Sequence, residues 1–270
     1  MLRDITLGQY YPADSVIHRL DPRVKLFGTM IYIISLFSVR GIVALGATTL
    51  FLFAVIKVSK VPFKFMVKGL RAIMILLLIT AVFNLFLTPG ETLVSFWKIR
   101  ITEEGVANAV MMAVRLTFLI LGTSIMTLTT TPNQLTDGLE KSLMPMSKIG
   151  VPVHAIAMMM SIALRFIPIL IEETDKIMKA QMARGADFES GNLLKRVKNM
   201  IPLLVPLFIS AFRRADDLAM AMEARCYHGG EGRTKMKPLR YAKRDYVAYL
   251  ILTVYLAGVI ACRVFLPWPQ

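Results

Sequence analysis

The sequence predicts an all-α membrane protein with five transmembrane helices and a cytosolic or interfacial helical coupling region that contains two long crossed helices. Apolar residues make up 56% of the 270-residue chain and charged residues 19%. Soluble domains are nearer about 45–50% apolar and about 25% charged. Several apolar runs approach the length of a membrane span, and the charged residues gather between those runs.

The first apolar run, Leu26–Ile56, is interrupted only by Arg40. A span needs about 20 residues, so each half is short unless flanking Lys and Arg side chains reach the membrane surfaces. Lys57–Arg71 holds five Lys/Arg and no acid, and Thr129–Asp245 holds 18 Lys/Arg against 12 Asp/Glu. With a cytosolic N-terminus, a hairpin of two spans places both basic segments in the cytosol, as the positive-inside rule requires, whereas a single span would place both outside. The run is therefore predicted to form two helices.

Three further runs complete the five expected spans, namely Ala72–Thr88, Val106–Leu128 and Tyr246–Cys262. No removable signal peptide precedes the first run, so we expect that run to stay in the protein. We expect residues 1–128 to form a four-span bundle, residues 129–245 cytosolic coupling helices, and residues 246–270 the fifth transmembrane helix with a short extracytoplasmic tail. The N-terminus is predicted to be cytosolic and the C-terminus extracytoplasmic.

The basic insert is too long and too charged for a simple loop. Thr131 is a suitable N-cap for a first helix that begins with Pro132 and ends near Leu143. Two longer helices are predicted after Pro145 and Gly150, at about Val153–Arg184 and Leu203–Arg225, with a turn at Ser190–Asn192 between them. Cysteine adopts a left-handed cap less easily than glycine, so the second long helix is expected to continue past Cys226 to Gly229.

A competing interpretation makes Val151–Ile171 a sixth span. Ile201–Phe212 would then have to return as a seventh, but it is short and contains Pro202 and Pro206. The parity required by the last span favours neither segment crossing. Both helices are expected to lie partly in the inner-leaflet interface or packed under the spans.

An internal repeat ends the two long helices. Asp175–Gly185 resembles Asp216–Cys226, with aspartate, two alanines and arginine at the same offsets. One arginine at a helix C-terminus is favourable on its own through the helix dipole. Two matched copies suggest a binding role in addition to this local stabilisation. The planar guanidinium group suits carboxylates and backbone carbonyls, so two such helix ends could enter two acidic grooves on partner proteins.

The motifs together resemble the transmembrane T component of energy-coupling factor transporters. The stretches that carry the resemblance are Leu20–Leu26, Thr131–Leu139, Leu164–Pro168, Ala180–Gly185, Arg214–Leu218 and Ala221–Arg225. The resemblance implies a prokaryotic plasma-membrane subunit that joins two ABC-type ATPases to a separate substrate-capture membrane subunit, the S component, for vitamin or metal uptake. It also implies the residues that dock the two ATPases: Ala183, Arg184 and Gly185 at one helix end, and Ala224, Arg225 and Cys226 at the other.

No cofactor is expected in this chain, since ATP would be bound by the partner ATPases. The stretch Gly229–Lys235 lacks the spacing of a phosphate loop. Asp216 and Asp217 form a single acidic pair, expected to pair with the neighbouring arginines rather than to hold a metal. The three histidines have no Cys or carboxylate at ligand spacing, and the two cysteines are far apart. A net charge of +14 fits the positive-inside bias, so we expect the lipid bilayer and no nucleic acid as a partner.

Two other classes of function remain open. A stand-alone secondary transporter or channel predicts polar, interrupted spans near the midplane, whereas Arg115 is the one charge inside the fourth run. We expect Arg115 to pair within the bundle. A membrane-embedded transferase predicts a clustered acidic or histidine site facing the cytosol. The chain's 18 methionines predict interfacial filler or an adaptable contact surface.

Overall fold

The computed structural model describes residues 9–39, 41–89, 92–96, 99–188, 192–229, 236 and 238–265. The described chain divides into two compact units. The first unit contains the described residues from 9 to 138 together with those from 239 onward, and the second contains those between 139 and 238. The last helix is thus grouped with the first four, whereas the domain boundaries expected after residues 128 and 245 stay a prediction.

Among its described residues, the first unit contains five apolar helices. They are α1 (Pro22–Ser38), α2 (Ile42–Ser59), α3 (Phe63–Leu87), α4 (Glu103–Thr129) and α9 (Lys243–Phe265). Helix α4 packs against the first three helices, and α9 packs against α1 and α2. The first apolar run forms two helices, as the charge placement predicts. Arg40, expected at the turn between them, lies outside the described residues.

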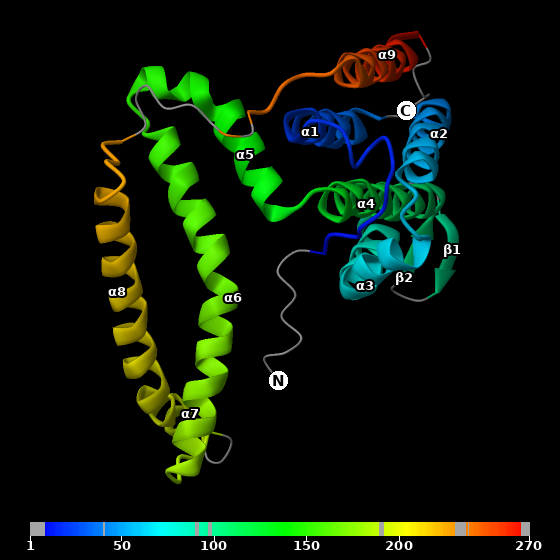
Figure 1. The fold of residues 1–270 in the computed structure, drawn as a ribbon. Helices are drawn as coiled ribbons and strands as arrows, with labels where there is room; N and C mark the ends of the chain where they lie inside the picture. Colours follow the sequence, from blue (N-terminus) through cyan, green and yellow to red (C-terminus); the bar gives the residue numbers. More distant parts are fainter. Residues whose placement is uncertain are drawn as a thin grey trace. The chain divides into compact units, whose positions relative to one another are not determined.

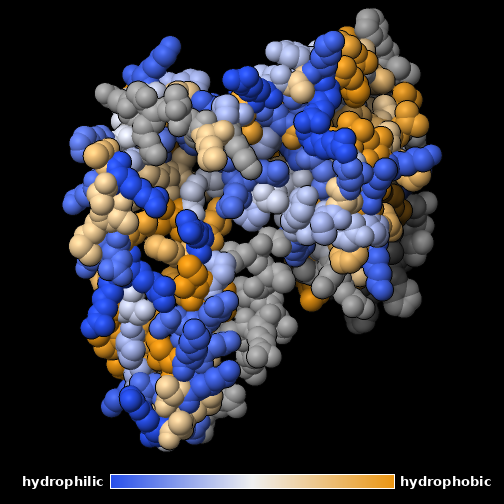
Figure 2. All heavy atoms as spheres, in the orientation of Figure 1, coloured by the Kyte–Doolittle hydropathy of each residue, from blue (hydrophilic) through white to orange (hydrophobic). Residues whose placement is uncertain are grey.

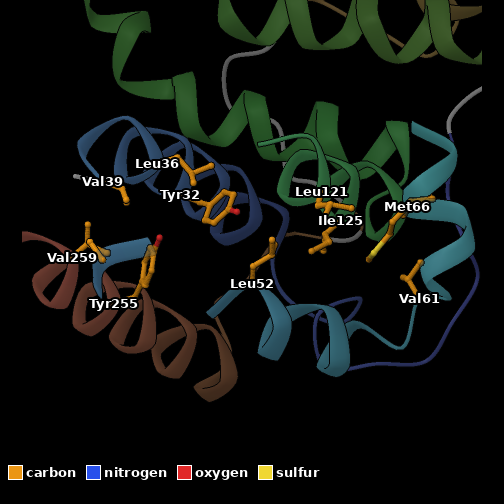
Figure 3. Packing of buried hydrophobic residues seen from close by; sticks show 12 residues of the cluster. Tyr32, Leu36, Val39, Leu52, Val61, Met66, Leu121, Ile125, Tyr255 and Val259 are labelled. Atoms are coloured by element: carbon orange, nitrogen blue, oxygen red, sulfur yellow. The ribbon is translucent and has the colours of Figure 1, made fainter. Parts of the chain in front are cut away.

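Buried apolar side chains from α1, α2, α3, α4 and α9 form the core of this unit, with Met66 as the contribution of α3 (Figure 3). Tyr255 on α9 stacks on Phe51 of α2, with ring centroids 4.1 Å apart. Its hydroxyl also lies 2.8 Å from the Ser35 hydroxyl on α1. Gly122 allows close approach, because a Cβ there would lie 2.2 Å from the Tyr32 ring. Aromatic stacking and internal hydrogen bonds thus join α9 to the helices that precede the insert.

A short antiparallel hairpin, absent from the sequence prediction, lies between α3 and α4. Strands β1 (Thr92–Phe96) and β2 (Ile99–Thr102) pair with Phe96 opposite Ile99. Their β-branched and aromatic residues favour extended backbone. Thr102 then caps α4, since its Oγ accepts a hydrogen bond from the Gly105 N–H at 3.0 Å. The other regular secondary structure of the described residues is helical, which confirms an all-α membrane protein apart from this connection.

The outward surfaces of the bundle helices are apolar. Leu50, Ile75 and Leu78 are more than two-thirds exposed, as expected for side chains that face lipid. Figure 2 shows hydrophobic side chains gathered at the edge where α2 and α9 lie. Among the described residues, α4, α6 and α9 are long and apolar enough to cross a membrane, while Val43–Ser59 and Ile73–Phe86 are shorter apolar stretches.

The second unit contains the two long helices of the insert. Helix α5 (Pro132–Leu143) begins with the predicted cap and leads through the 3₁₀ helix η2 (Met144–Ile149) to α6 (Val153–Ala183). Thr131 and Gln134 exchange hydrogen bonds of 3.1 and 3.3 Å as a capping box. A short helix not predicted from sequence, α7 (Leu193–Asn199), joins α6 to α8 (Ile201–Glu223). Figure 1 shows α6 and α8 side by side and antiparallel, with α7 at one end of the pair.

Helix α6 has the length and composition of a span, whereas α8 does not meet the same criterion. Both helices were predicted to lie partly in the inner-leaflet interface or under the spans, because Ile201–Phe212 is too short to return across the membrane. The placement of α6 and α8 partly in the inner-leaflet interface or under the spans therefore stays a prediction.

Candidate coupling surface

The first of the two arginine motifs ends α6 in a Schellman motif. The Gly185 N–H donates to the Met182 carbonyl at 2.9 Å, and the Ala186 N–H donates to the Gln181 carbonyl at 3.0 Å. Gly185 has φ +90°, the left-handed conformation that this motif requires. Arg184 is therefore the last residue before the chain reverses, and its backbone is fixed by these hydrogen bonds.

The second motif ends α8 in the same way. The Cys226 N–H donates to the Glu223 carbonyl at 2.8 Å, and the Tyr227 N–H donates to the Met222 carbonyl at 3.1 Å. Cys226 takes the left-handed position with φ 56°. The prediction that α8 continues to Gly229 is therefore wrong, because the carbonyls of the last turn gain these two partners in spite of the cost of a left-handed cysteine.

All six predicted docking residues are exposed at the two helix ends: Ala183, Arg184, Gly185, Ala224, Arg225 and Cys226. With the residues that the structure describes, neither arginine side chain forms an ion pair or hydrogen bond. Because α6 and α8 are antiparallel, the two motifs lie at opposite ends of the helix pair (Figure 1). The helix pair thus presents two matching guanidinium groups that are free to meet an external acceptor.

An ion pair joins the two long helices between these ends. The Arg214 guanidinium on α8 donates to a carboxylate oxygen of Glu173 on α6 at 3.0 Å. The prediction that Arg214 pairs with the neighbouring Asp216 and Asp217 is therefore wrong. Asp216, two positions along the helix, faces away from Arg214. Asp217, three positions along, is within helical reach, yet the Arg214 guanidinium meets Glu173 on the neighbouring helix.

Apolar side chains on α6 and α8 remain exposed. Among them are Ile156, Met159, Met160, Leu204, Val205, Phe208, Ile209, Phe212 and Met220. Figure 2 shows such hydrophobic groups interspersed with hydrophilic ones over this unit. An exposed surface of this kind marks contact with another protein or with lipid, and its methionines and aromatics can adapt to more than one partner.

The stretch Leu20–Leu26 lies where the insert leaves and re-enters the first unit. Asp21 caps α1, because its carboxylate accepts a hydrogen bond from the Arg23 N–H at 2.9 Å. The Asp21 N–H donates to the carboxylate of Asp245, in the first turn of α9, at 2.9 Å. The Lys25 ammonium donates to the carbonyl of Thr129 at 2.7 Å, at the end of α4. Burial opposes ionisation of Asp21, but the hydrogen bonds from Arg23 outweigh it and lower the pKa of that carboxyl.

Asp245 completes this arrangement. Its carboxylate is almost fully buried, with 1% exposure of the residue, and its second oxygen accepts from the Ala242 N–H at 2.7 Å. Arg23 pairs with Asp21 and lies 3.9 Å over the ring of Tyr241. We name the residues Asp21, Arg23, Lys25, Tyr241 and Asp245 the anchor cluster. The sequence predicted no structural role for Asp245, and the stretch Leu20–Leu26 was noted only as part of the family resemblance.

The other side chains considered as candidate sites make structural contacts where the structure describes them. Arg115 donates to the Val39 carbonyl at the end of α1 at 2.9 Å, which confirms the expected pairing within the bundle. His154 lies 3.1 Å from Glu140, a partner that its sequence spacing did not indicate. No group of three or more metal-ligating side chains occurs among the described residues. Most of the stretch Gly229–Lys235, weighed as a phosphate loop, lies outside the described residues.

Comparison with known proteins bears on this architecture. Residues 13–236 match the family model described as cobalt transport protein, CbiQ. The chain is 57% identical over 267 residues to the energy-coupling factor transporter transmembrane protein EcfT of Clostridium kluyveri, covering 98% of this chain and 99% of that one. The chain belongs to this family. Proteins of the same name in Thermosediminibacter oceani (52% over 262 residues, 97% and 99% covered) and Acidaminococcus fermentans (50% over 268 residues, 99% and 98% covered) are similar along their whole length.

Membership of the EcfT family makes the chain a transmembrane protein of a transport system, as the sequence analysis predicted. The family match includes Leu20–Leu26 and both helix ends at Arg184 and Arg225. The anchor cluster and the two Schellman ends are therefore features of an energy-coupling factor transporter subunit.

Proposed function

We propose that the chain is the scaffold and energy-transmission subunit of an ATP-driven importer, and that it docks two ABC-type ATPases through Arg184 and Arg225. The single observation that carries the proposal is the matched pair of helix ends. Each exposed arginine stands at the same position of the same Schellman motif, beside Ala183 and Gly185 at one end and Ala224 and Cys226 at the other. Two matching arginine ends suit two matching acidic binding sites, here called sockets, on two similar partners.

A guanidinium at a helix end suits a docking contact for a physical reason. Its planar fork can donate two parallel hydrogen bonds to a carboxylate, and the rigid helix behind it transmits a displacement of that carboxylate along its axis. The chain itself needs no cofactor in this scheme, since the ATPases bind and hydrolyse ATP. A movement of the two ATPases toward or away from each other would therefore displace the two ends of the α6–α8 pair.

The exposed apolar surface of α6 and α8 supplies the other contact. We assign it to a separate S component that captures a vitamin or a metal ion, with Phe208 and Phe212 among the contacts. These two rings already pack edge to face, with centroids 4.8 Å apart, and form a firm aromatic ridge. Substrate specificity would then reside in the S component.

The proposed setting is the prokaryotic plasma membrane. The five helices of the first unit would cross it, with the N-terminus and the insert in the cytosol and the C-terminus outside. A stand-alone transporter is less well supported, because Arg115 and Tyr255 use their polar groups for contacts within the bundle. Such contacts stabilise helix packing rather than line a pathway.

Co-purification tests the proposal. The chain would be expressed with the candidate ATPases of its source organism, extracted in detergent and captured by a tag on the membrane chain. We expect Arg184→Glu and Arg225→Glu each to weaken ATPase retention, and the double variant to lose it. The matched control is Arg213→Glu, which reverses an exposed arginine on α8 away from the helix end. Full retention by the double variant would refute docking through these arginines.

A further inference from the structure

The repeat that ends the two long helices also extends toward their middle, with a change of charge. The positions that precede the shared aspartates are Glu172 and Glu173 in the first copy and Arg213 and Arg214 in the second. The sequence offset is the same 41 residues that relates the two docking arginines. Two acids in one copy thus correspond to two bases in the other.

The structure brings one of these equivalent pairs into contact. Glu173 and Arg214 form the ion pair between α6 and α8 at 3.0 Å, so a residue of one copy meets its own counterpart in the other. Two similar antiparallel helices are related by a two-fold axis between them. A residue that touches its own counterpart must lie beside that axis. The Glu173–Arg214 pair therefore marks an approximate two-fold axis of the helix pair.

Burial follows the same symmetry. On α8, the partly or fully buried positions other than Pro206 are Leu203, Leu207, Ser210, Ala211, Arg214, Leu218 and Met222. Their counterparts, 41 residues earlier on α6, are also at least partly buried: Ile162, Phe166, Ile169, Leu170, Glu173, Ile177 and Gln181. Seven inner-face positions thus correspond over about five turns. The correspondence is incomplete, because Arg165, the counterpart of the partly buried Pro206, is exposed, and Ile167 on α6 is partly buried while its counterpart Phe208 is exposed.

The charges at the axis follow from this geometry. In a strictly symmetric pair, a charged residue on the axis would face an identical charge, and the repulsion would separate the helices. An acid in one copy and a base in the other turns that repulsion into attraction. Both side chains are partly shielded, with 26% exposure for Glu173 and 37% for Arg214, so solvent screens the pair less than it would on an open surface.

The position of the pair also sets the positions of the docking ends. Arg184 follows Glu173 by the same number of residues as Arg225 follows Arg214. At a rise of 1.5 Å per residue, each arginine lies about 17 Å along its helix from the ion pair, so the two ends are about 33 Å apart on opposite sides of the axis.

We propose that the Glu173–Arg214 pair is the pivot of the coupling helices, which holds Arg184 and Arg225 in two-fold-related positions for two sockets that are themselves related by a two-fold axis. The inference rests on the proposed function and adds a positioning role for two residues that contact no ATPase. Without the pair, the ends would still bind, but a displacement of one would no longer move the other by a fixed amount.

The first test uses the membrane chain alone. Spin labels are attached at Ala183→Cys and Ala224→Cys in a chain whose own cysteines are replaced by Cys226→Ser and Cys262→Ser. Pulsed electron paramagnetic resonance then measures the distance between the two helix ends. We expect a single narrow distribution with Glu173 and Arg214 present. Glu173→Arg and Arg214→Glu should each broaden or shift it, and the double exchange Glu173→Arg with Arg214→Glu should restore it. This readout needs no ATPase, so it is independent of the docking proposal.

The second test uses the complete complex in proteoliposomes. Each single reversal should keep both ATPases bound while ATP-driven uptake falls by about 5- to 150-fold, the range typical of coupling between two sites, and the double exchange should recover it. Glu172→Arg and Arg213→Glu are the matched controls, since these exposed neighbours undergo the same change of charge. Controls as damaging as the reversals, or a double exchange without recovery in either test, would overturn the pivot. Loss of the ATPases from the Arg184→Glu and Arg225→Glu variants would still be expected in that case.

Discussion

Cys226 occupies a backbone conformation that an L residue adopts at a cost of about 1–2 kcal/mol, while the equivalent Gly185 does not carry that cost. The position nevertheless completes the Schellman hydrogen bonds of α8. The cap geometry therefore depends on the backbone and does not need the thiol. The guanidinium of Arg225 stands one residue before it, so its placement follows from the same backbone.

Replacement of Cys226 by glycine should therefore preserve ATPase docking and leave the membrane chain equally or more stable, by up to about 1 kcal/mol after the entropy of the added glycine is counted. Cys226→Val should lower stability, because a β-branched residue adopts φ +56° at greater cost. Thermal unfolding in detergent, with co-purification of the ATPases, measures both effects. A lower unfolding midpoint for Cys226→Gly than for the parent chain would contradict the assignment of strain to this residue.

His18 is held as a neutral ring. Its Nε2 donates to the Tyr11 carbonyl at 3.0 Å, and its Nδ1 lies 2.7 Å from the Ser15 hydroxyl, which donates to it. Burial is the main cause that lowers the pKa of His18 below 6.5. The unfolded chain therefore takes up the proton first as pH falls, and the stability contribution present above pH 6.5 declines from there toward the folded pKa.

We expect the unfolding midpoint to fall between pH 7 and pH 5 in the parent chain and to fall less steeply in His18→Gln, which keeps a donor for the Tyr11 carbonyl. Light-scattering or fluorescence melting curves at several pH values measure the slope. Identical slopes for the two chains would show that His18 does not bind fewer protons in the folded state. His228→Gln, an exposed histidine, is the control.

At the scale of elements, the helices of the insert were the most predictable. Thr131, Pro132 and Gly150 mark the borders of α5 and η2 because caps and left-handed turns depend on local residue types. The hairpin β1–β2 and the short helix α7 were missed. Neither is set by hydrophobic periodicity over a long window, which is the main signal in a sequence.

The contacts between elements were less predictable than the elements themselves. Arg214 has acidic neighbours along the chain, yet it pairs with Glu173 on another helix. Asp245 is distant in sequence from Asp21, and only the packing of α9 against α1 brings the two together. Residue spacing indicates partners within one helix, whereas partners across a fold depend on the tertiary arrangement.

The anchor cluster fixes both chain connections of the insert to the start of α1. Asp245→Ala would remove the acceptor of the Asp21 and Ala242 N–H groups and leave them buried, at a cost of about 1–3 kcal/mol for each unpaired group. We expect a lower unfolding midpoint of the membrane chain, partial recovery in Asp245→Asn, and little change in the exposed control Asp14→Ala. Equal midpoints for Asp245→Ala and the parent chain would exclude an anchoring role.

At the scale of the whole molecule, the two units have different stabilising contacts. The first has a buried core of aromatic and aliphatic side chains joined by the anchor cluster. The second has a long helix pair with exposed apolar surface and an ion pair at its middle. An element that transmits motion benefits from few internal contacts, since its position can then follow its partners. We propose that the first unit is the fixed membrane bundle and that the α6–α8 pair is the part that moves with its partners.

The central claim is that each docking arginine holds one ATPase. Native mass spectrometry of the complex captured through the membrane chain counts the ATPases bound to it. The account predicts two ATPases for the parent chain, one as the main species for either Arg184→Glu or Arg225→Glu, and none for the double variant. Two ATPases retained by the double variant, or both lost together in each single variant while Arg213→Glu keeps two, would contradict one socket for each arginine.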